Sequence, residues 1–276
     1  MEAVLGTRRV LAGGTAGGGV PRPVPGCRSV VSRTWADQID ADNLLSSPAS
    51  VFFGVVLPIL VGIVLLYAFA ASLGWTRELF ARQPIGGRWW MWILPIVVLA
   101  FNVLRFAAVD YSRYTTATVL MVLFMGLCVG VAEETYTRGF AVNLMRKGGH
   151  GELSVALVSS LIFALSHATN ILGGQAVTTV ALTVLYTLGF GVAMYFTLRV
   201  TRNLIWPMLL HATTDPSGFL LSGGIDKTAG AATPSSLASI ANLSNPVIIV
   251  LGLILVWFIR GRVSDRQANR QPANAE

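Results

Sequence analysis

The sequence predicts an all-α protein, a polytopic transmembrane helix bundle of about seven spans, with six to eight as the range. Its composition is the first observation: of 276 residues, 54% are hydrophobic and only 12% are charged, roughly half the charged fraction of an average soluble domain. The second is that several apolar runs reach the ~20 residues that a helix needs to cross a bilayer. The clearest begin at Val51 ("VFFGVVLPILVGIVLLYAFAASLGW") and Ala176 ("AVTTVALTVLYTLGFGVAMYFTL").

The two ends of the chain differ in composition from the middle. Residues 1–45 contain "AGGTAGGGVPRPVPG" and several arginines, a composition that cannot bury enough apolar surface to fold. We therefore expect a disordered N-terminal tail at 1–45, a bundle at 46–260 and a disordered C-terminal tail at 261–276. The predicted spans are 51–74, 89–109, 115–147, 152–172, 176–199, 203–222 and 244–260.

The basic residues fall between and beyond the apolar runs, so the net charge of +7 indicates membrane topology and not nucleic-acid binding. Alternating the connections across the membrane places twelve of the 20 Lys and Arg residues on the side of the C-terminus. Because basic loops stay in the cytoplasm, we expect a cytoplasmic C-terminus in a multi-pass protein of a bacterial cell membrane. An eighth span or a re-entrant segment would reverse the external N-terminus that seven spans imply.

Ionisable residues interrupt three of the apolar runs, "CVGVAEETYTRGF", "SSLIFALSHATNIL" and "LIWPMLLHATTDPSGFLL". In chain order they are Glu133, Glu134, Arg138, His167, His211 and Asp215. Such groups normally face a bundle interior or a wet cavity, where they pair. At ~1.5 Å per residue from the predicted cytoplasmic helix ends, Glu134, His167 and Asp215 lie ~20, ~22 and ~18 Å deep. The matched depths predict one shared cavity, whereas each group alone would be taken for an interfacial ion pair or a packing residue.

The spacing of these residues suggests how they pair. Glu134 and Arg138 are four residues apart, so they lie on one helix face and can form a salt bridge that keeps Glu134 ionised. Glu133 is rotated by ~100° and is the freer carboxylate. His211 and Asp215 are also four apart, a spacing at which the carboxylate could orient the imidazole or both could face one substrate.

Three motifs lie in order on these runs. "EETYTR" fits EExxxR, "FALSH" fits FxxxH, and "HATTD" nearly fits HxxxN. With them the chain resembles the CAAX-processing and bacteriocin-processing protease family, which includes the type II CAAX prenyl endopeptidases and the Abi proteins, over a core of about residues 115–222. The resemblance implies an intramembrane endopeptidase with an active-site cavity. Its partners would be the lipid bilayer and a membrane-embedded or membrane-associated protein or peptide substrate, with no nucleic acid.

The resemblance also assigns roles to the residues that match its motifs. Glu133 would be the general base that activates water, and Glu134 the second acid, tied to Arg138. His167 would stabilise the oxyanion or hold the water, and His211 would line the site.

Asp215 departs from the family pattern, which has Asn at this position. An amide can donate a hydrogen bond to an oxyanion and an ionised carboxylate cannot. Asp215 would therefore be protonated, orient His211 or bind a metal; otherwise His167 or Asn170 would supply the donor.

No cofactor is favoured, and zinc is the alternative, because two histidines with carboxylates are a suitable ligand set. Its ligands would be Glu133, His167 and His211. The chain lacks HExxH, which argues against a zinc protease of that type. Cys27 and Cys128 lie in very different settings and predict neither a disulfide nor a cysteine metal site.

Two other classes of function fit part of the pattern. A non-catalytic membrane scaffold or immunity protein of the same fold would keep the motifs without turnover. A small proton-coupled transporter could use the intramembrane acids and histidines as a relay.

Overall fold

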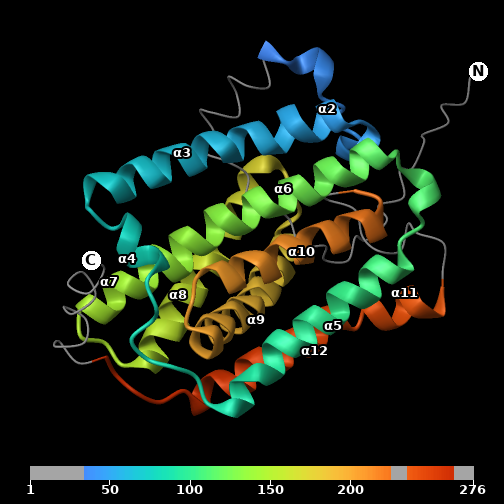
Figure 1. The fold of residues 1–276 in the computed structure, drawn as a ribbon. Coiled ribbons are helices and arrows are strands. Elements are labelled where there is room, and N and C mark those ends of the chain that lie inside the picture. The colour runs from blue at the N-terminus through green and yellow to red at the C-terminus, as the bar shows by residue number, and fades with distance from the viewer. Residues whose placement is uncertain (1–33, 225–234, 264–276) are drawn as a thin grey trace, which may run out of the picture.

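The computed structural model describes residues 34–224 and 235–263, and within these ranges it consists of helices without strands (Figure 1). The predicted all-α fold is confirmed. Six helical stretches are long and apolar enough to cross a membrane: Pro48–Ser72, Trp89–Ala108, Thr116–Lys147, Glu152–Leu172, Val177–Thr201 and Ser236–Phe258.

Several of these stretches combine α-helix with 3-10 or π-helical turns. The first is built from α2 (Pro48–Val51), π-helical η3 (Phe52–Val56) and α3 (Leu57–Ser72), and the short α4 (Thr76–Phe80) follows it. The second and third are η4 (Trp89–Trp92) with α5 (Ile93–Ala108), and α6 (Thr116–Glu134) with π-helical η6 (Thr135–Ala141) and α7 (Val142–Lys147). The others are α8 (Glu152–Ser166) with η7 (His167–Gly173), α9 (Val177–Thr201), and α11 (Ser236–Ala241) with α12 (Ser244–Leu255) and η9 (Val256–Phe258).

The segment predicted as the sixth span, 203–222, forms helix α10 (Ile205–Ser222), which is not one of the six apolar stretches. His211, Asp215 and several hydroxyl residues make it too polar. It nevertheless runs the length of the bundle (Figure 1). It starts directly after the end of α9, and near its own end the Leu220 carbonyl accepts from the hydroxyl of Tyr114, which precedes the start of α6, at 2.8 Å. Figure 1 shows α10 between α6 and α5. The bundle thus surrounds one polar helix with apolar ones.

Helices α6 and α10 approach so closely that only glycine fits between their backbones. A Cβ atom at Gly130 would lie 2.5 Å from the Met208 carbonyl oxygen, and one at Gly126 would collide with Ala212 and Pro216. Gly126 and Gly130 form a GxxxG pattern, which is typical of close helix contacts in membranes. The acidic end of α6 is thereby brought against α10.

Parts of both predicted tails, residues 1–33 and 264–276, lie outside the described residues. The described part of the N-terminal segment contains the short 3-10 helices Ala36–Gln38 and Leu44–Ser46 and buries Leu45. The first long helix begins at Pro48, where the Ser47 hydroxyl accepts the Ser50 N–H at 3.1 Å and caps it. The predicted start of the span, Val51, is therefore three residues late.

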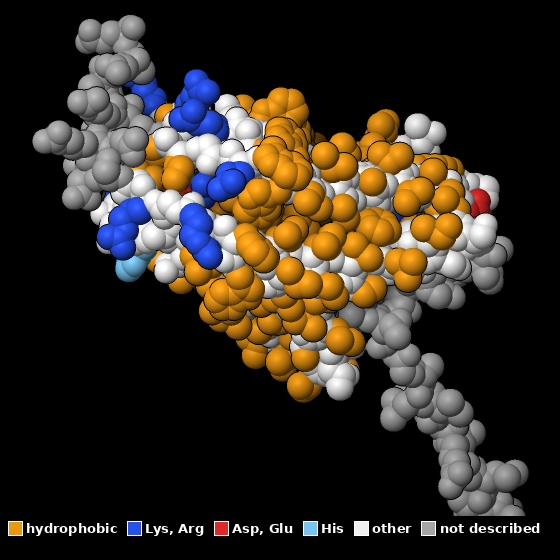
Figure 2. Space-filling view, turned by 90° about the horizontal axis from the view of Figure 1, so that it is seen from below, with side chains coloured by type: hydrophobic (Ala, Val, Ile, Leu, Met, Phe, Trp, Pro, Cys, Tyr) orange, Lys and Arg blue, Asp and Glu red, His pale blue; other side chains and the backbone are white. Residues whose placement is uncertain are grey.

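One end of the bundle carries most of the basic residues of the described chain. A buried cluster lies there: Arg146 donates to both Glu152 carboxylate oxygens at 2.8 Å, and Arg199 donates to one of them at 3.1 Å. The exposed basic residues at this end are Arg77, Arg82, Arg88, Lys147, Arg260 and Arg262. Figure 2 shows Lys and Arg gathered at this end and hydrophobic side chains covering the middle of the molecule. This is the surface of an integral membrane protein.

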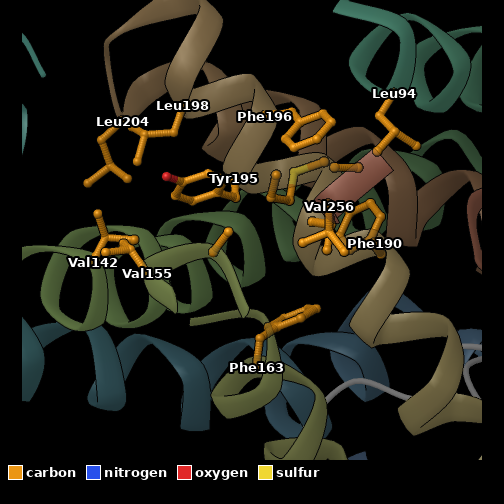
Figure 3. Packing of buried hydrophobic residues seen from close by; sticks show 14 of the residues in the cluster. Leu94, Val142, Val155, Phe163, Phe190, Tyr195, Phe196, Leu198, Leu204 and Val256 are labelled. Carbon is orange, nitrogen blue, oxygen red and sulfur yellow. The ribbon is translucent and has the colours of Figure 1, made fainter. Parts of the chain in front are cut away.

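The largest apolar cluster packs α9 against its neighbours. Figure 3 shows Tyr195, Phe196 and Leu198 of α9 within it, and Phe163 and Phe190 further along. Phe163 and Phe190 form the boundary between this core and the polar residues of the bundle.

Candidate active site

The two glutamates and Arg138 lie at the junction of α6 and η6. The helix continues without a break from Thr116 to Lys147, as predicted, and the turn that carries Arg138 is π-helical. π-helical turns are frequent at functional sites. Arg138 Nη1 lies 3.1 Å from Glu134 Oε1, and both side chains are fully buried.

Three further contacts fix the Arg138 guanidinium. Its Nη1 donates to the Thr137 hydroxyl at 2.6 Å and its Nη2 to the Gly191 carbonyl at 2.7 Å. The Phe163 ring lies 4.8 Å from the guanidinium carbon, a cation–π contact. Arg138 is thus held by α6, α8 and α9 together.

A small polar cavity lies on the other side of Arg138. Its volume is about 20 Å³, room for roughly one water molecule. Arg138 Nε and Asn143 Nδ2 are buried and make no hydrogen bond within the described chain. The lining residues are Glu78, Leu79, Gln83, Pro84, Arg138, Gly139, Asn143, Arg146 and Val263.

His211 on α10 is the centre of the polar cluster. Its Nδ1 lies 2.7 Å from Glu134 Oε1, and since a carboxylate only accepts, Nδ1 carries the proton of this bond. Its Nε2 lies 3.6 Å from Glu133 Oε2 and 3.8 Å from Asp215 Oδ2. Two carboxyl groups, one from α6 and one from α10 itself, thus lie near Nε2.

The three acids differ in their access to solvent. The Glu134 side chain is 0% exposed, whereas those of Glu133 and Asp215 are 15% and 20% exposed. Glu133 and Asp215, the two carboxyl groups near His211 Nε2, are therefore partly accessible. Among the described residues, an arginine pairs with Glu134 but with neither Glu133 nor Asp215.

His167 lies at the junction of α8 and η7. Its Nδ1 is 3.0 Å from the Phe163 carbonyl, which can only accept, so this bond leaves Nε2 without a proton in the neutral ring. Across the described ranges, no hydrogen bond or ion pair joins His167 to Glu133, Glu134 or Asp215. The Phe163 ring contacts both imidazoles edge-on, with centroid distances of 5.0 Å to His167 and 5.8 Å to His211.

Asn170 is fully buried one turn after His167. Neither its side-chain oxygen nor its nitrogen has a hydrogen-bond partner in the described part of the protein. A buried amide normally makes hydrogen bonds, so Asn170 keeps an unused donor on the same element as His167.

Arg105 was not among the site residues predicted from the sequence. It lies on α5, is 9% exposed, and donates through Nη2 to the Ser244 hydroxyl and to Asn245 Oδ1, the latter at 2.9 Å. The signal was present, since Arg105 interrupts the apolar run "VVLAFNVLRFAAV", and such residues are functional candidates.

The three residues expected as zinc ligands come from different helices. Among the residues that the structure describes, no three His, Cys, Asp or Glu side chains are grouped closely enough to hold a metal ion. Glu133 and His211 are neighbours, but His167 lies apart from them, beyond Phe163.

Residues 115–216 match the family model described as type II CAAX prenyl endopeptidase Rce1-like. The matched segment runs from the residue before α6 into α10 and contains both glutamates, Arg138, both buried histidines and Asp215. The Rce1-like family is one of membrane CAAX-type proteases, so the resemblance inferred from the three motifs is confirmed. The comparisons with curated proteins and with solved structures found no match.

Proposed function

We propose that the protein is an intramembrane endopeptidase that hydrolyses a peptide bond of a membrane-associated protein or peptide. One observation carries the proposal: the accessible Glu133 carboxylate and His211 Nε2 lie 3.6 Å apart inside a membrane bundle. The match of residues 115–216 to the Rce1-like family model supports it. A base and a hydrogen-bond donor at this separation can act on the two sides of one carbonyl carbon.

In the proposed reaction, Glu133 takes a proton from a water molecule, and the resulting hydroxide attacks the scissile carbonyl carbon. The carbonyl oxygen gains the negative charge and accepts a hydrogen bond from the Nε2–H of His211. The carbon–nitrogen bond then breaks, and Glu133 returns its proton to the departing amine. The products are a new carboxylic acid and a new amine, which exchange a proton to become a carboxylate and an ammonium ion, and the site regains its starting charge.

Glu134 and Arg138 support this reaction without touching the substrate. Glu134 accepts from His211 Nδ1, which aims Nε2 toward Glu133. Arg138 fixes the position of the Glu134 carboxylate through their buried salt bridge. We assign the oxyanion to His211 and not to His167, because His211 Nε2 faces Glu133 directly. His167, whose Nε2 is free to accept, would help to hold the water, and Asn170 is a further amide donor.

We further propose that the basic end of the bundle faces the cytoplasm, since Lys and Arg mark the cytoplasmic side. The C-terminus would then be cytoplasmic, in the cell membrane of a bacterium. The active site would be reached from within the membrane or from its cytoplasmic surface.

The proposal is tested by comparing the membrane proteomes of wild-type cells and cells that carry Glu133→Gln. Uncleaved precursors of one or a few membrane-associated proteins should accumulate in the variant. If the proteomes match and the phenotypes match as well, the chain is a non-catalytic scaffold. If they match but proton uptake into vesicles differs, it is a transporter.

The reaction drawn above uses no metal, and chelation of the purified protein tests this. Cleavage in detergent should be unchanged after dialysis against a strong chelator, because water is activated by Glu133. Loss of cleavage that zinc restores would contradict the metal-free reaction and would favour Glu133, His167 and His211 as ligands. The same chelator saturated with magnesium is the control, because it cannot remove zinc but has the same other effects on the detergent solution.

A further inference from the structure

The small cavity beside Arg138 has no part in the proposed reaction. Nη1 and Nη2 of Arg138 already donate to protein oxygens, so Nε is the guanidinium nitrogen that makes no hydrogen bond within the described chain. Asn143 lines the same cavity, and its Nδ2 is also buried without a partner in this part of the protein. Because a buried donor without an acceptor is unfavourable, the cavity requires a group that accepts hydrogen bonds.

The π-helical turn accounts for the shared position of Arg138 and Asn143. The two are five residues apart in the chain, and in a regular α-helix they would point ~140° away from each other. Element η6 (Thr135–Ala141) is π-helical, and its wider turns bring residues five apart over one another. Both side chains therefore line one cavity.

The charges around the cavity are balanced, which indicates a neutral occupant. Each charged group that lines it has an opposite charge within 3.1 Å: Arg138 has Glu134, Arg146 has Glu152, and Glu78 has Lys147. An anion would bring an unpaired charge into a buried place, whereas a water molecule brings none. The volume of about 20 Å³ is also that of one water molecule.

A water molecule in this cavity would find partners for its lone pairs and for its protons. It would accept from Arg138 Nε and from Asn143 Nδ2. It would donate to Glu78, whose carboxylate lines the cavity and keeps lone pairs after the bond from Lys147. Three partners are the usual number for a buried water molecule.

We propose that a buried water molecule bridges Arg138 Nε and Asn143 Nδ2, and that Asn143 is through it a positioning residue of the active site. The water holds the third nitrogen of the guanidinium, while protein oxygens hold the other two. The guanidinium holds the Glu134 carboxylate, which accepts from His211 Nδ1. The effect on the reaction rests on the proposed endopeptidase function, whereas the water site itself does not.

Crystal structures of the full-length protein, at a resolution that shows ordered water, test the site. Wild type should show one solvent peak within hydrogen-bond distance of both nitrogens. Asn143→Leu should lose this peak, because leucine has nearly the shape of asparagine and donates no hydrogen bond. No peak in wild type, or an equal peak in the variant, would overturn the inference. Crystals grown in bromide check the occupant, since an anomalous signal at this position would mean an anion and not water.

The positioning role is tested by kinetics. Asn143→Leu should lower kcat by roughly tenfold and leave KM within about twofold, because the guanidinium acts through Glu134 and does not touch the substrate. Asn143→Ser keeps a hydroxyl donor and leaves room for the water, so it should recover most of kcat.

Asn102→Leu is the matched control, since it is the same substitution at another buried amide, one that donates to Thr213 and Thr214. It should lower the melting temperature and leave the solvent peak beside Arg138 in place.

A merely structural role of Asn143 gives a different pattern. If Asn143→Leu melts earlier but keeps the kcat of wild type, or if Asn143→Ser is as slow as Asn143→Leu, Asn143 does not position Arg138 and the inference is wrong. If wild type cleaves nothing, the proposed function fails; the solvent peak of wild type and its loss in Asn143→Leu still decide the water site.

Discussion

Glu133→Gln should lower kcat for peptide cleavage by about 10² to 10⁴-fold, the usual contribution of a general base. The amide has the shape of the carboxylate and cannot take a proton from water. KM should change little, because Glu133 acts on the water and not on binding. The measurement is cleavage of a precursor found in the proteomic comparison, by purified protein in detergent.

Folding must be separated from chemistry in this experiment. Because the Glu133 side chain is 15% exposed and has no arginine partner in the described residues, the variant should melt within a few degrees of wild type. Glu133→Asp is a useful second variant, since it keeps the base and withdraws it by one methylene, and it should keep intermediate activity. A Glu133→Gln protein that cleaves at the wild-type rate would contradict the assigned base.

Arg138→Met should destabilise the protein by about 3–5 kcal/mol, the typical effect of breaking a buried ion pair from one side. The variant leaves Glu134 charged or forces it to take up a proton, with both outcomes in a fully buried setting. It also removes the hydrogen bond to the Gly191 carbonyl between η6 and α9. Unfolding in mixed detergent micelles, followed by circular dichroism, gives the free-energy change.

Two controls test whether the loss of stability comes from the buried, unpaired charge. Adding Glu134→Gln to Arg138→Met should recover part of the loss, because no uncompensated charge remains. Lys147→Met breaks a pair of similar length, 2.8 Å to Glu78, in which the lysine is 33% exposed; it should cost less than about 1 kcal/mol. If Arg138→Met and Lys147→Met lower the free energy of unfolding equally, the buried ion pair of Arg138 stabilises the protein no more than an exposed one, and the prediction is wrong.

Much of the site could be predicted because it is encoded locally. The spacing of Glu134 and Arg138 predicts their salt bridge, and "EETYTRGFAVNLMRK" contains no helix breaker, so a helix that continues to Lys147 follows from the sequence. The matched depths of Glu134, His167 and Asp215 depend only on helix rise and on where each helix starts.

The parts that the sequence did not predict depend on packing between helices. The direct bond from His211 to Glu134 requires the close approach of α6 and α10 at Gly126 and Gly130, and helical periodicity does not show which faces meet. For the same reason the sequence did not single out Arg105, which lies on α5 close to Gly218 of α10. Helix α10 was counted as an apolar span, while it lies among other helices and can therefore be polar.

The most direct test of the central claim is cleavage in oxygen-18 water by wild-type protein and by Glu133→Gln, both reconstituted in vesicles. Hydrolysis by activated water predicts that wild type yields a product whose new C-terminal carboxylate contains one oxygen-18 atom, and that the variant yields almost none. Equal labelled product from both proteins, or no cleavage by wild type, would contradict the account.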